Sequence, residues 1–385
     1  MSTIAIRAAR ALTPLEEIRD AVVLVEDGTI RDVGPREGVV LPKGAQEHEA
    51  PGQTLLPGFV DVHIHGAGGH DVMEATPEAL QAIATTAARY GTTSLLATTV
   101  TASADETCRS VEGIARYIRG PQPARAAEFL GIHFEGPFLS HARRGVQPAE
   151  WISPPSLPLF EKLFRAAGGC ARILTLAPEV PGALDLISEA RKRDLIVAMG
   201  HTDATHDQAT AAIERGAHHA VHVFNAMRPF SHRETGVLGA ILTSPDVTAE
   251  LIADGVHVDP AAMRLLFAAK GTDRVLLVSD ATAAAGMPDG TYRLGTFEVV
   301  VTGGVCRNKE GRLAGSTLTL DRALRNVVAL GVPLADAVRM LTLNPARLLG
   351  MEEKKGVLAP GADADLVFLD KNLQVTRVFC RGVSS

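Results

Sequence analysis

The sequence has 385 residues, of which 46% are hydrophobic and 21% charged, and a formal net charge of −6. This composition supplies a large apolar core and excludes a disordered chain. Without long runs of lysine or arginine, the acidic balance argues against nucleic acid or an anionic membrane surface as the main partner. A closed α/β barrel absorbs most of this length as one unit.

The N-terminal residues and the cysteines indicate where the protein works. The first residues, MSTIAIRAARALTP, lack the apolar core of a secretory signal, and no window reaches the apolar length of a membrane span. The four cysteines lie far apart without CxxC spacing, which predicts free thiols. We therefore expect a cytoplasmic protein.

The two ends of the chain have a different pattern from its middle. Residues 1–55 and 356–385 contain short β-prone segments, such as Ala21–Val25, Ala364–Leu369 and Val375–Cys380, and turn signals such as Glu26-Asp27-Gly28. We expect these ends to pair into one small β-sandwich-like domain that flanks a barrel domain of residues 56–355.

Residues 56–355 alternate short apolar runs with helical patterns, which is typical of βαβ units. Thr76-Pro77-Glu78 predicts a helix start and Gly91 its end, and Asp259-Pro260 and Gly271 bracket another helix in the same way. The pattern predicts a (β/α)8 TIM-type barrel with strands near Gly58–His63, Ser94–Val100, Phe129–Phe134, Ile173–Ala177, Leu195–Met199, His219–Phe224, Thr248–Ala253 and Val275–Ser279.

Several residues of metal-ligand type lie at the carboxyl ends of these strands, which share one face of a parallel barrel. His63 and His65 are two residues apart on an extended segment, so both imidazoles can approach one cation. An isolated HxH pair is more often two satisfied histidines. The conjunction with residues at the other strand ends makes the metal interpretation much more specific.

Three further strands supply the rest of the candidate set. Glu135 ends an apolar strand, where an unpaired carboxylate would be costly unless a metal or a basic side chain compensates it. His133 points to the same face as Glu135 and competes with it for this role. His201 follows another strand, whereas spacing alone cannot separate His219 from His222 on the next one.

Asp280 closes the last predicted barrel strand. A carboxylate beside an activated water can take its proton and later return it to a leaving amine. The competing interpretation is an N-cap for the next helix. The presence of the other candidate residues favours the catalytic role.

Six strings of the sequence together resemble the amidohydrolase superfamily and, within it, the N-acetylglucosamine-6-phosphate deacetylase family. The resemblance extends over nearly the whole chain, including its β-rich ends. The strings are Pro57–Gly66 (PGFVDVHIHG), Phe134–Leu139 (FEGPFL), Gly200–Thr205 (GHTDAT), His222–Met227 (HVFNAM), Ala253–His257 (ADGVH) and Ser279–Ala283 (SDATA).

This resemblance implies roles for the site residues. Glu135, His201 and His222 would bind a divalent metal, while His63 and His65 would complete a second site that Glu135 bridges. Asp280 would be the catalytic acid and base. Some family members carry other residues in place of the HxH pair and work with one metal, so the presence of the pair here favours a two-metal site. The expected cofactor is one or two divalent metals per subunit, most readily zinc, with iron, manganese or cobalt as alternatives.

The resemblance also implies how substrate is held. Those single-metal members have a histidine where this chain has Gln147, a position thought to polarise the substrate carbonyl. Arg233 and His257 would face the sugar phosphate, as a phosphate on an acidic protein needs a local cationic cluster. In the family this arginine can come from the neighbouring subunit of a homodimer. The other implied substrate contacts are Val146, Asn225, Ala226, Leu313, Ala314 and Gly315.

The implied reaction is hydrolysis of the acetamide of N-acetyl-D-glucosamine 6-phosphate to D-glucosamine 6-phosphate and acetate, in amino-sugar catabolism and cell-wall recycling. One alternative is a cyclic amidohydrolase of the dihydroorotase or hydantoinase kind, which often bridges its metals with a carboxylated lysine. No lysine lies at these strand ends. A non-catalytic barrel scaffold is the other alternative, but such a protein would be expected to lose ligands that this chain keeps.

Overall fold

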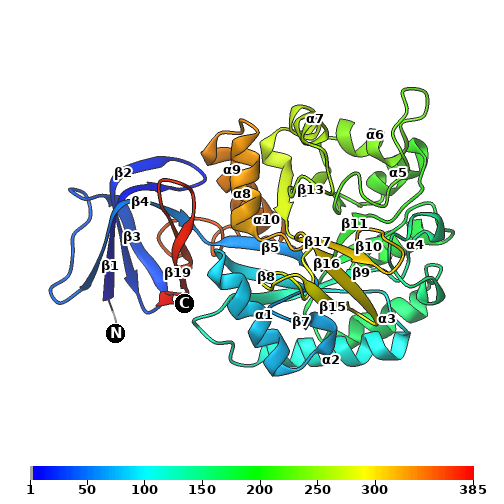
Figure 1. Cartoon of the computed structure of the whole chain (residues 1–385), viewed down its shortest axis with the longest axis horizontal. Helices are drawn as coiled ribbons and strands as arrows, with labels where there is room; N and C mark the ends of the chain where they lie inside the picture. Colours follow the sequence, from blue (N-terminus) through cyan, green and yellow to red (C-terminus); the bar gives the residue numbers. More distant parts are fainter. Residues whose placement is uncertain (1–2) are drawn as a thin grey trace.

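A computed structural model describes residues 3–385 as a barrel with a separate sheet at one side (Figure 1). The barrel strands are parallel and hydrogen-bonded in the order β14-β13-β12-β11-β10-β9-β8-β5. A parallel bridge from Ile64 to Ala281 joins the two end strands. The strands are β5 (Phe59–Ile64), β8 (Thr92–Thr99), β9 (Glu128–Glu135), β10 (Ala171–Leu176), β11 (Ile196–Met199), β12 (His219–Ala220), β13 (Thr248–Ile252) and β14 (Val275–Val278).

The predicted barrel is therefore confirmed, and each of its eight strands lies where an apolar run predicted it. The strand predicted at His219–Phe224 is much shorter than expected, since β12 ends at Ala220. Every residue of β8 is buried, because the strands carry side chains toward both the barrel interior and the surrounding helices.

Helices cover the outside of the barrel (Figure 1). Thr76 caps the first one through a hydrogen bond from the Ala79 amide to its hydroxyl (3.2 Å), as predicted. The helices are α1 (Pro77–Arg89), α2 (Ala104–Arg119), α3 (Leu157–Ala166), α4 (Ala183–Arg191), α5 (His206–Glu214), α6 (Gly236–Thr243), α7 (Pro260–Lys270), α8 (Leu320–Ala329), α9 (Leu334–Leu341) and α10 (Leu343–Leu348), with 3-10 turns η1 (Val72–Glu74), η2 (His141–Arg143), η3 (Ala149–Trp151) and η4 (Thr272–Arg274).

The two ends of the chain form one seven-stranded sheet, so the prediction that they pair with each other beside the barrel is confirmed. A buried cluster joins Ile6 and Val23 to Leu366 and Phe379, which lie on opposite sides of the central strand, so the sheet curls over its own core. Its order is β20 (Val383–Ser384), β19 (Val375–Cys380), β18 (Leu366–Leu369), β4 (Gln46–Pro57), β1 (Thr3–Leu12), β2 (Glu17–Glu26) and β3 (Thr29–Pro35).

An antiparallel three-stranded sheet over the barrel mouth was not predicted. It consists of β15 (Gly290–Leu294), β16 (Phe297–Thr302) and β17 (Val305–Asn308), and a small hairpin, β6 (Gly66–Ala67) with β7 (His70–Asp71), lies beside it. Leu294 and Val299 pack against Val100 at the end of β8. The Gly295 amide also donates to the Asp71 carboxylate (2.8 Å), which ties the sheet to the barrel.

Two sequence-based expectations about the rest of the chain can be compared with the structure. All four cysteines are free, as predicted, and all four are buried. Within residues 3–385, no helix combines the length and apolar character that crossing a membrane requires.

Candidate active site

A cavity of about 180 Å³ opens at the carboxyl ends of the barrel strands. Both the barrel and the three-stranded sheet contribute to it, because Leu294 of β15 lies in its wall. Its lining residues are His65, Val100, Glu135, Gly145, Val146, Gln147, His201, His222, Asn225, Ala226, His257, Asp280, Leu294, Leu313 and Gly315. Most of the predicted site residues therefore meet in one place.

Glu135 lies at the centre of the polar cluster. Its Oε1 is 3.1 Å from His201 Nε2 and 3.0 Å from His222 Nε2, and these two nitrogens are 3.1 Å apart. The Nε2 atoms of His63 and His65 lie 3.4 and 3.5 Å from the two Glu135 oxygens. Four imidazoles thus direct the same ring atom at one buried carboxylate.

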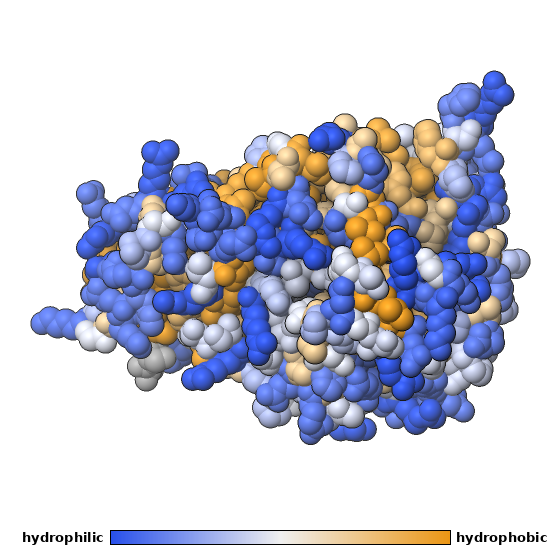
Figure 2. All heavy atoms as spheres, in the orientation of Figure 1, coloured by the Kyte–Doolittle hydropathy of each residue, from blue (hydrophilic) through white to orange (hydrophobic). Residues whose placement is uncertain are grey.

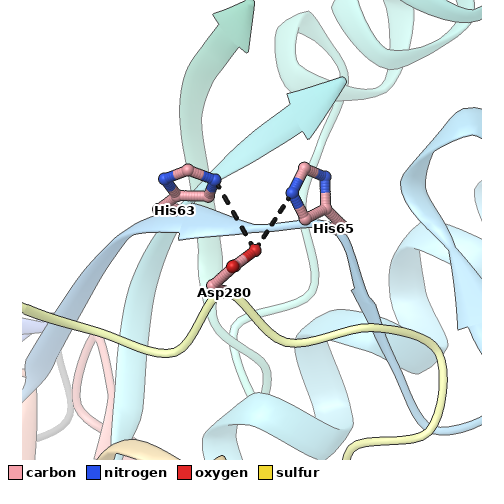
Figure 3. A group of neighbouring side chains, drawn as sticks. All are labelled: His63, His65 and Asp280. Carbon is pink, nitrogen blue, oxygen red and sulfur yellow. Dashed lines mark ion pairs between the residues drawn. The ribbon is translucent and has the colours of Figure 1, made fainter. Parts of the chain in front are cut away.

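Asp280 approaches the cluster from the loop after β14. Its Oδ1 lies 3.7 Å from His63 Nε2 and 3.2 Å from His65 Nε2, and the two histidines extend toward it from β5 and from the residue just after its end (Figure 3). The carboxylate lines the cavity, so it can reach a ligand there. This is the position that a proton-transferring group would need.

In three of these histidines, the ring nitrogen that faces away from the cluster is hydrogen-bonded to a residue outside the cluster. His63 Nδ1 lies 2.8 Å from Glu250 Oε2, His65 Nδ1 3.0 Å from the Thr98 carbonyl, and His201 Nδ1 3.2 Å from the Arg143 carbonyl. Since these oxygens only accept hydrogen bonds, each Nδ1 carries the proton. When Nε2 is unprotonated, each imidazole presents its lone pair to the cavity.

This donor set fits a divalent cation. Lone pairs of the Nε2 atoms and of Glu135 would repel one another at about 3 Å unless a proton or a cation lies among them. Within the described part of the chain His63 Nε2 is buried without a hydrogen-bond partner. Imidazole and carboxylate are the ligands that zinc and its neighbouring divalent metals accept. The cluster is therefore able to bind such a metal.

The electrostatics of the cluster without a cation agree with this interpretation. Burial would raise the pKa of Glu135, but its contacts with His201, His222 and His63 outweigh burial and hold that pKa well below its usual value. Burial is likewise outweighed at Asp280, where the hydrogen bond with His65 and nearby imidazole charges lower the pKa. Asp280 is thus a carboxylate at neutral pH.

Backbone conformation also sets the site apart. His201, His222, Ala226 and Asp280 have φ values of +46°, +30°, +51° and +47°, a left-handed region that non-glycine residues rarely adopt. Such strain concentrates at functional sites, where the surrounding fold holds it in place.

The two alternatives left open by the sequence are separated by geometry. His133 is hydrogen-bonded away from the cluster, with Nδ1 3.0 Å from the Val62 carbonyl and Nε2 2.8 Å from Thr175 Oγ1. Burial lowers the pKa of His133 to about 3, so it is neutral. His219 contacts Thr248 and Glu250, and it is His222 that reaches Glu135.

The predicted substrate contacts divide into two groups. Val146, Asn225, Ala226, His257, Leu313 and Gly315 line the cavity, and Gln147 lies among them with its side-chain amide donating to Glu135. Ala314 lies directly behind, fully buried in the core beneath the three-stranded sheet. Arg233 is exposed on the loop before α6 and does not line this cavity.

Comparison with known proteins agrees with this architecture. The amidohydrolase family model matches residues 54–384. The chain belongs to the amidohydrolase family. A Bacillus subtilis protein named N-acetylglucosamine-6-phosphate deacetylase is 38% identical over 96% of this chain and 94% of its own length. An Escherichia coli O157:H7 protein named N-acetylgalactosamine-6-phosphate deacetylase is 39% identical, covering 98% of each.

A solved structure of the same amidohydrolase family is also similar. It is a mutant N-acetyl-D-glucosamine-6-phosphate deacetylase from Mycobacterium smegmatis in complex with N-acetyl-D-glucosamine 6-phosphate. Its TM-score is 0.93 at 38% identity, with 100% of this chain and 99% of that chain covered. These relatives confirm the family resemblance predicted from the six strings, and the cyclic-amide alternative is not favoured.

Sequence reasoning missed several residues that shape the site. Glu250 lies in the middle of β13 and contacts His63 directly. The signal was present, because a lone carboxylate inside an apolar barrel strand carries the same cost that drew attention to Glu135. Val100 and Leu294 had no such signal, since only the tertiary fold brings these apolar residues to the cavity.

Proposed function

We propose that this chain hydrolyses the acetamide of N-acetyl-D-glucosamine 6-phosphate to D-glucosamine 6-phosphate and acetate. The observation that carries the proposal is the cluster around Glu135, with the Asp280 carboxylate 3.2 Å from His65 Nε2 at the wall of the cavity. The family supports the same chemistry, because its relatives of comparable length are named as deacetylases of phosphorylated amino sugars.

The cation site follows from the donor set. Glu135, His201 and His222 would hold one divalent cation, and His63 and His65 would complete a second site with Glu135 between them. Zinc is the first candidate, with iron, manganese and cobalt as alternatives. Such a cation supplies Lewis-acid polarisation of the amide carbonyl and lowers the pKa of water toward about 7.

Asp280 performs the proton transfers. Its carboxylate accepts a proton from the attacking water as the oxygen adds to the acetyl carbonyl carbon. It then returns that proton to the C2 nitrogen as the carbon–nitrogen bond breaks, so that the amine leaves neutral. Gln147 is fixed at both ends, to Glu135 and to the Thr101 amide (2.9 Å), and we assign it first to orienting Glu135.

The sugar phosphate is proposed to face His257. Asp254 lies 2.7 Å from His257 Nδ1. Burial would lower the pKa of His257, but Asp254 outweighs burial and raises it, which favours the imidazolium that attracts a phosphate. The exposed Arg233 would add a second positive charge across a homodimer interface.

A homodimer is supported by the surface near α6 and α7, which pack against each other. Figure 2 shows hydrophobic side chains gathered over these helices on a largely polar face. Phe230 lies on the loop that carries Arg233, Val256 lies in the segment before α7 and Leu265 lies on α7; these side chains are 54%, 45% and 55% exposed. We propose that a partner subunit covers this face and that the enzyme works in the cytoplasm.

One second candidate has specific support, because a relative at 39% identity is named for the galactosamine epimer. The test compares kcat/KM for N-acetylglucosamine 6-phosphate and N-acetylgalactosamine 6-phosphate on the cation-loaded protein, with acetate and free amine both measured. We expect the gluco epimer to be preferred. A higher kcat/KM for the galacto epimer would transfer the assignment to that sugar, and no turnover of either would refute the proposed function.

A further inference from the structure

Glu250 is a buried carboxylate that lies outside the cavity and contacts two residues of the cluster, His63 and His222, together with the neighbouring His219. It occupies the middle of β13 and is 0% exposed. Its Oε2 lies 2.8 Å from His63 Nδ1 and accepts the His222 amide at 3.2 Å, while its Oε1 lies 2.9 Å from His219 Nε2. None of its atoms lines the cavity, so Glu250 can act on a ligand only through these neighbours.

His63 differs from the other imidazoles of the cluster in what holds it. The outward nitrogens of His65 and His201 lie against neutral backbone carbonyls, and His222 Nδ1 is buried without a hydrogen-bond partner in residues 3–385. Only the outward nitrogen of His63 lies on a carboxylate. A carboxylate in this position fixes the ring orientation and makes the opposite nitrogen a stronger donor to a cation.

The orientation of the His63 ring agrees with this effect of Glu250. Figure 3 shows one ring nitrogen of His63 facing Asp280 and the other on the far side of the ring. Glu250 contacts the far nitrogen, Nδ1, so the near nitrogen, Nε2, faces Glu135 and Asp280. His63 Nε2 has no hydrogen-bond partner among the described residues, although it is fully buried.

We propose that Glu250 is a positioning residue that creates the second cation site, by holding His63 with its Nε2 lone pair toward Glu135 and Asp280. This proposal rests on the two-cation site of the proposed function. Without Glu250, the chain keeps the Glu135, His201 and His222 site and loses tight binding at the His63 and His65 site.

The first experiment measures cations rather than activity. Wild-type protein, Glu250→Gln and the control Thr248→Val are stripped, titrated with Co²⁺ and analysed for bound metal and cobalt absorption. Thr248 lies on the same strand and contacts the far nitrogen of His219, but it does not touch a cluster ligand. We expect two cations per chain in wild type and in Thr248→Val.

In Glu250→Gln we expect the second cation to bind about 10- to 100-fold more weakly, the usual cost of losing such a partner. The first cation should keep its affinity within about threefold. Equal loss of both cations, unchanged binding of both, or a wild-type chain that binds a single cation would each overturn the proposal.

A second measurement covers the case in which Glu250→Gln does not fold. In zinc-loaded wild type with nitrogen-15 histidine, the ring resonances of His63 should report a protonated Nδ1, with His63→Asn giving the assignment. A His63 ring without that proton would contradict the proposal. Neither measurement uses substrate, so a chain that binds cations in this way but releases no acetate would refute the proposed function alone.

Discussion

Replacing Asp280 with asparagine tests the mechanism most sharply, because the side chain keeps its shape and loses its ability to accept a proton. No other free carboxylate lines the cavity in residues 3–385, since both oxygens of Glu135 are engaged by histidines and Gln147. General acid–base catalysis contributes about 10²- to 10⁴-fold. We therefore expect kcat to fall by that factor, which corresponds to about 3–5 kcal/mol in the barrier.

The assay combines acetate release with metal analysis. Asp280→Asn should lose turnover and retain the cation held by Glu135, His201 and His222, whereas His201→Ala should lose that cation as well. If Asp280→Asn lost the cation and His201→Ala kept it, the two roles would be reversed. Activity of Asp280→Asn within about tenfold of wild type would refute the role of Asp280 in proton transfer.

Three other outcomes are expected. The Lys355 side chain is 2% exposed, and its Nζ forms ion pairs with Glu128 (2.6 Å), Asp363 (2.8 Å) and Asp365 (2.9 Å). Lys355→Met should therefore cost about 3–5 kcal/mol of folding free energy and lower Tm by roughly 4–6 °C in calorimetry, whereas the control Lys354→Met, at an exposed lysine, should leave Tm unchanged. Burial would lower the pKa of Lys355, but the neighbouring carboxylates outweigh burial and raise that pKa. The stabilisation by Lys355 should therefore persist below about pH 10.4, the pKa of an unfolded lysine, and disappear as the pH rises through the higher pKa of the folded state. A loss of stabilisation already complete at pH 8 would contradict this expectation. Arg233→Ala should raise KM for the phosphorylated sugar far more than for unphosphorylated N-acetylglucosamine, and equal effects would exclude a phosphate contact. Chelation should lower Tm and added Zn²⁺ restore it, because binding to the folded state alone stabilises it; an unchanged Tm would argue against a bound cation.

The barrel was predictable because buried parallel strands appear as continuous apolar runs between turn residues. The chemistry-bearing residues at the ends of those runs, His201 and Asp280 among them, then had to meet at one mouth. The flanking sheet was predictable in outline for a related reason, since its short β-prone segments lie at both chain ends and have no other partner.

What could not be predicted depends on tertiary geometry. His219 and His222 were inseparable because β12 ends at Ala220 and the backbone turns left-handed at His222, which strand alternation does not foresee. Leu294 and the sheet that carries it come to the cavity through packing on Val100 and through the hydrogen bond from Gly295 to Asp71. The distance of Arg233 from the cavity depends on how the loop before α6 leaves the barrel.

The proposed reaction adds water across the acetamide of N-acetyl-D-glucosamine 6-phosphate. The most direct measurement is turnover of that sugar by cation-loaded protein in oxygen-18 water, with mass analysis of both products. Hydrolysis at the acetyl carbonyl carbon should give acetate that carries one oxygen-18 atom and an equal amount of unlabelled D-glucosamine 6-phosphate. No acetate from this sugar, together with hydrolysis of dihydroorotate or a hydantoin, would contradict it.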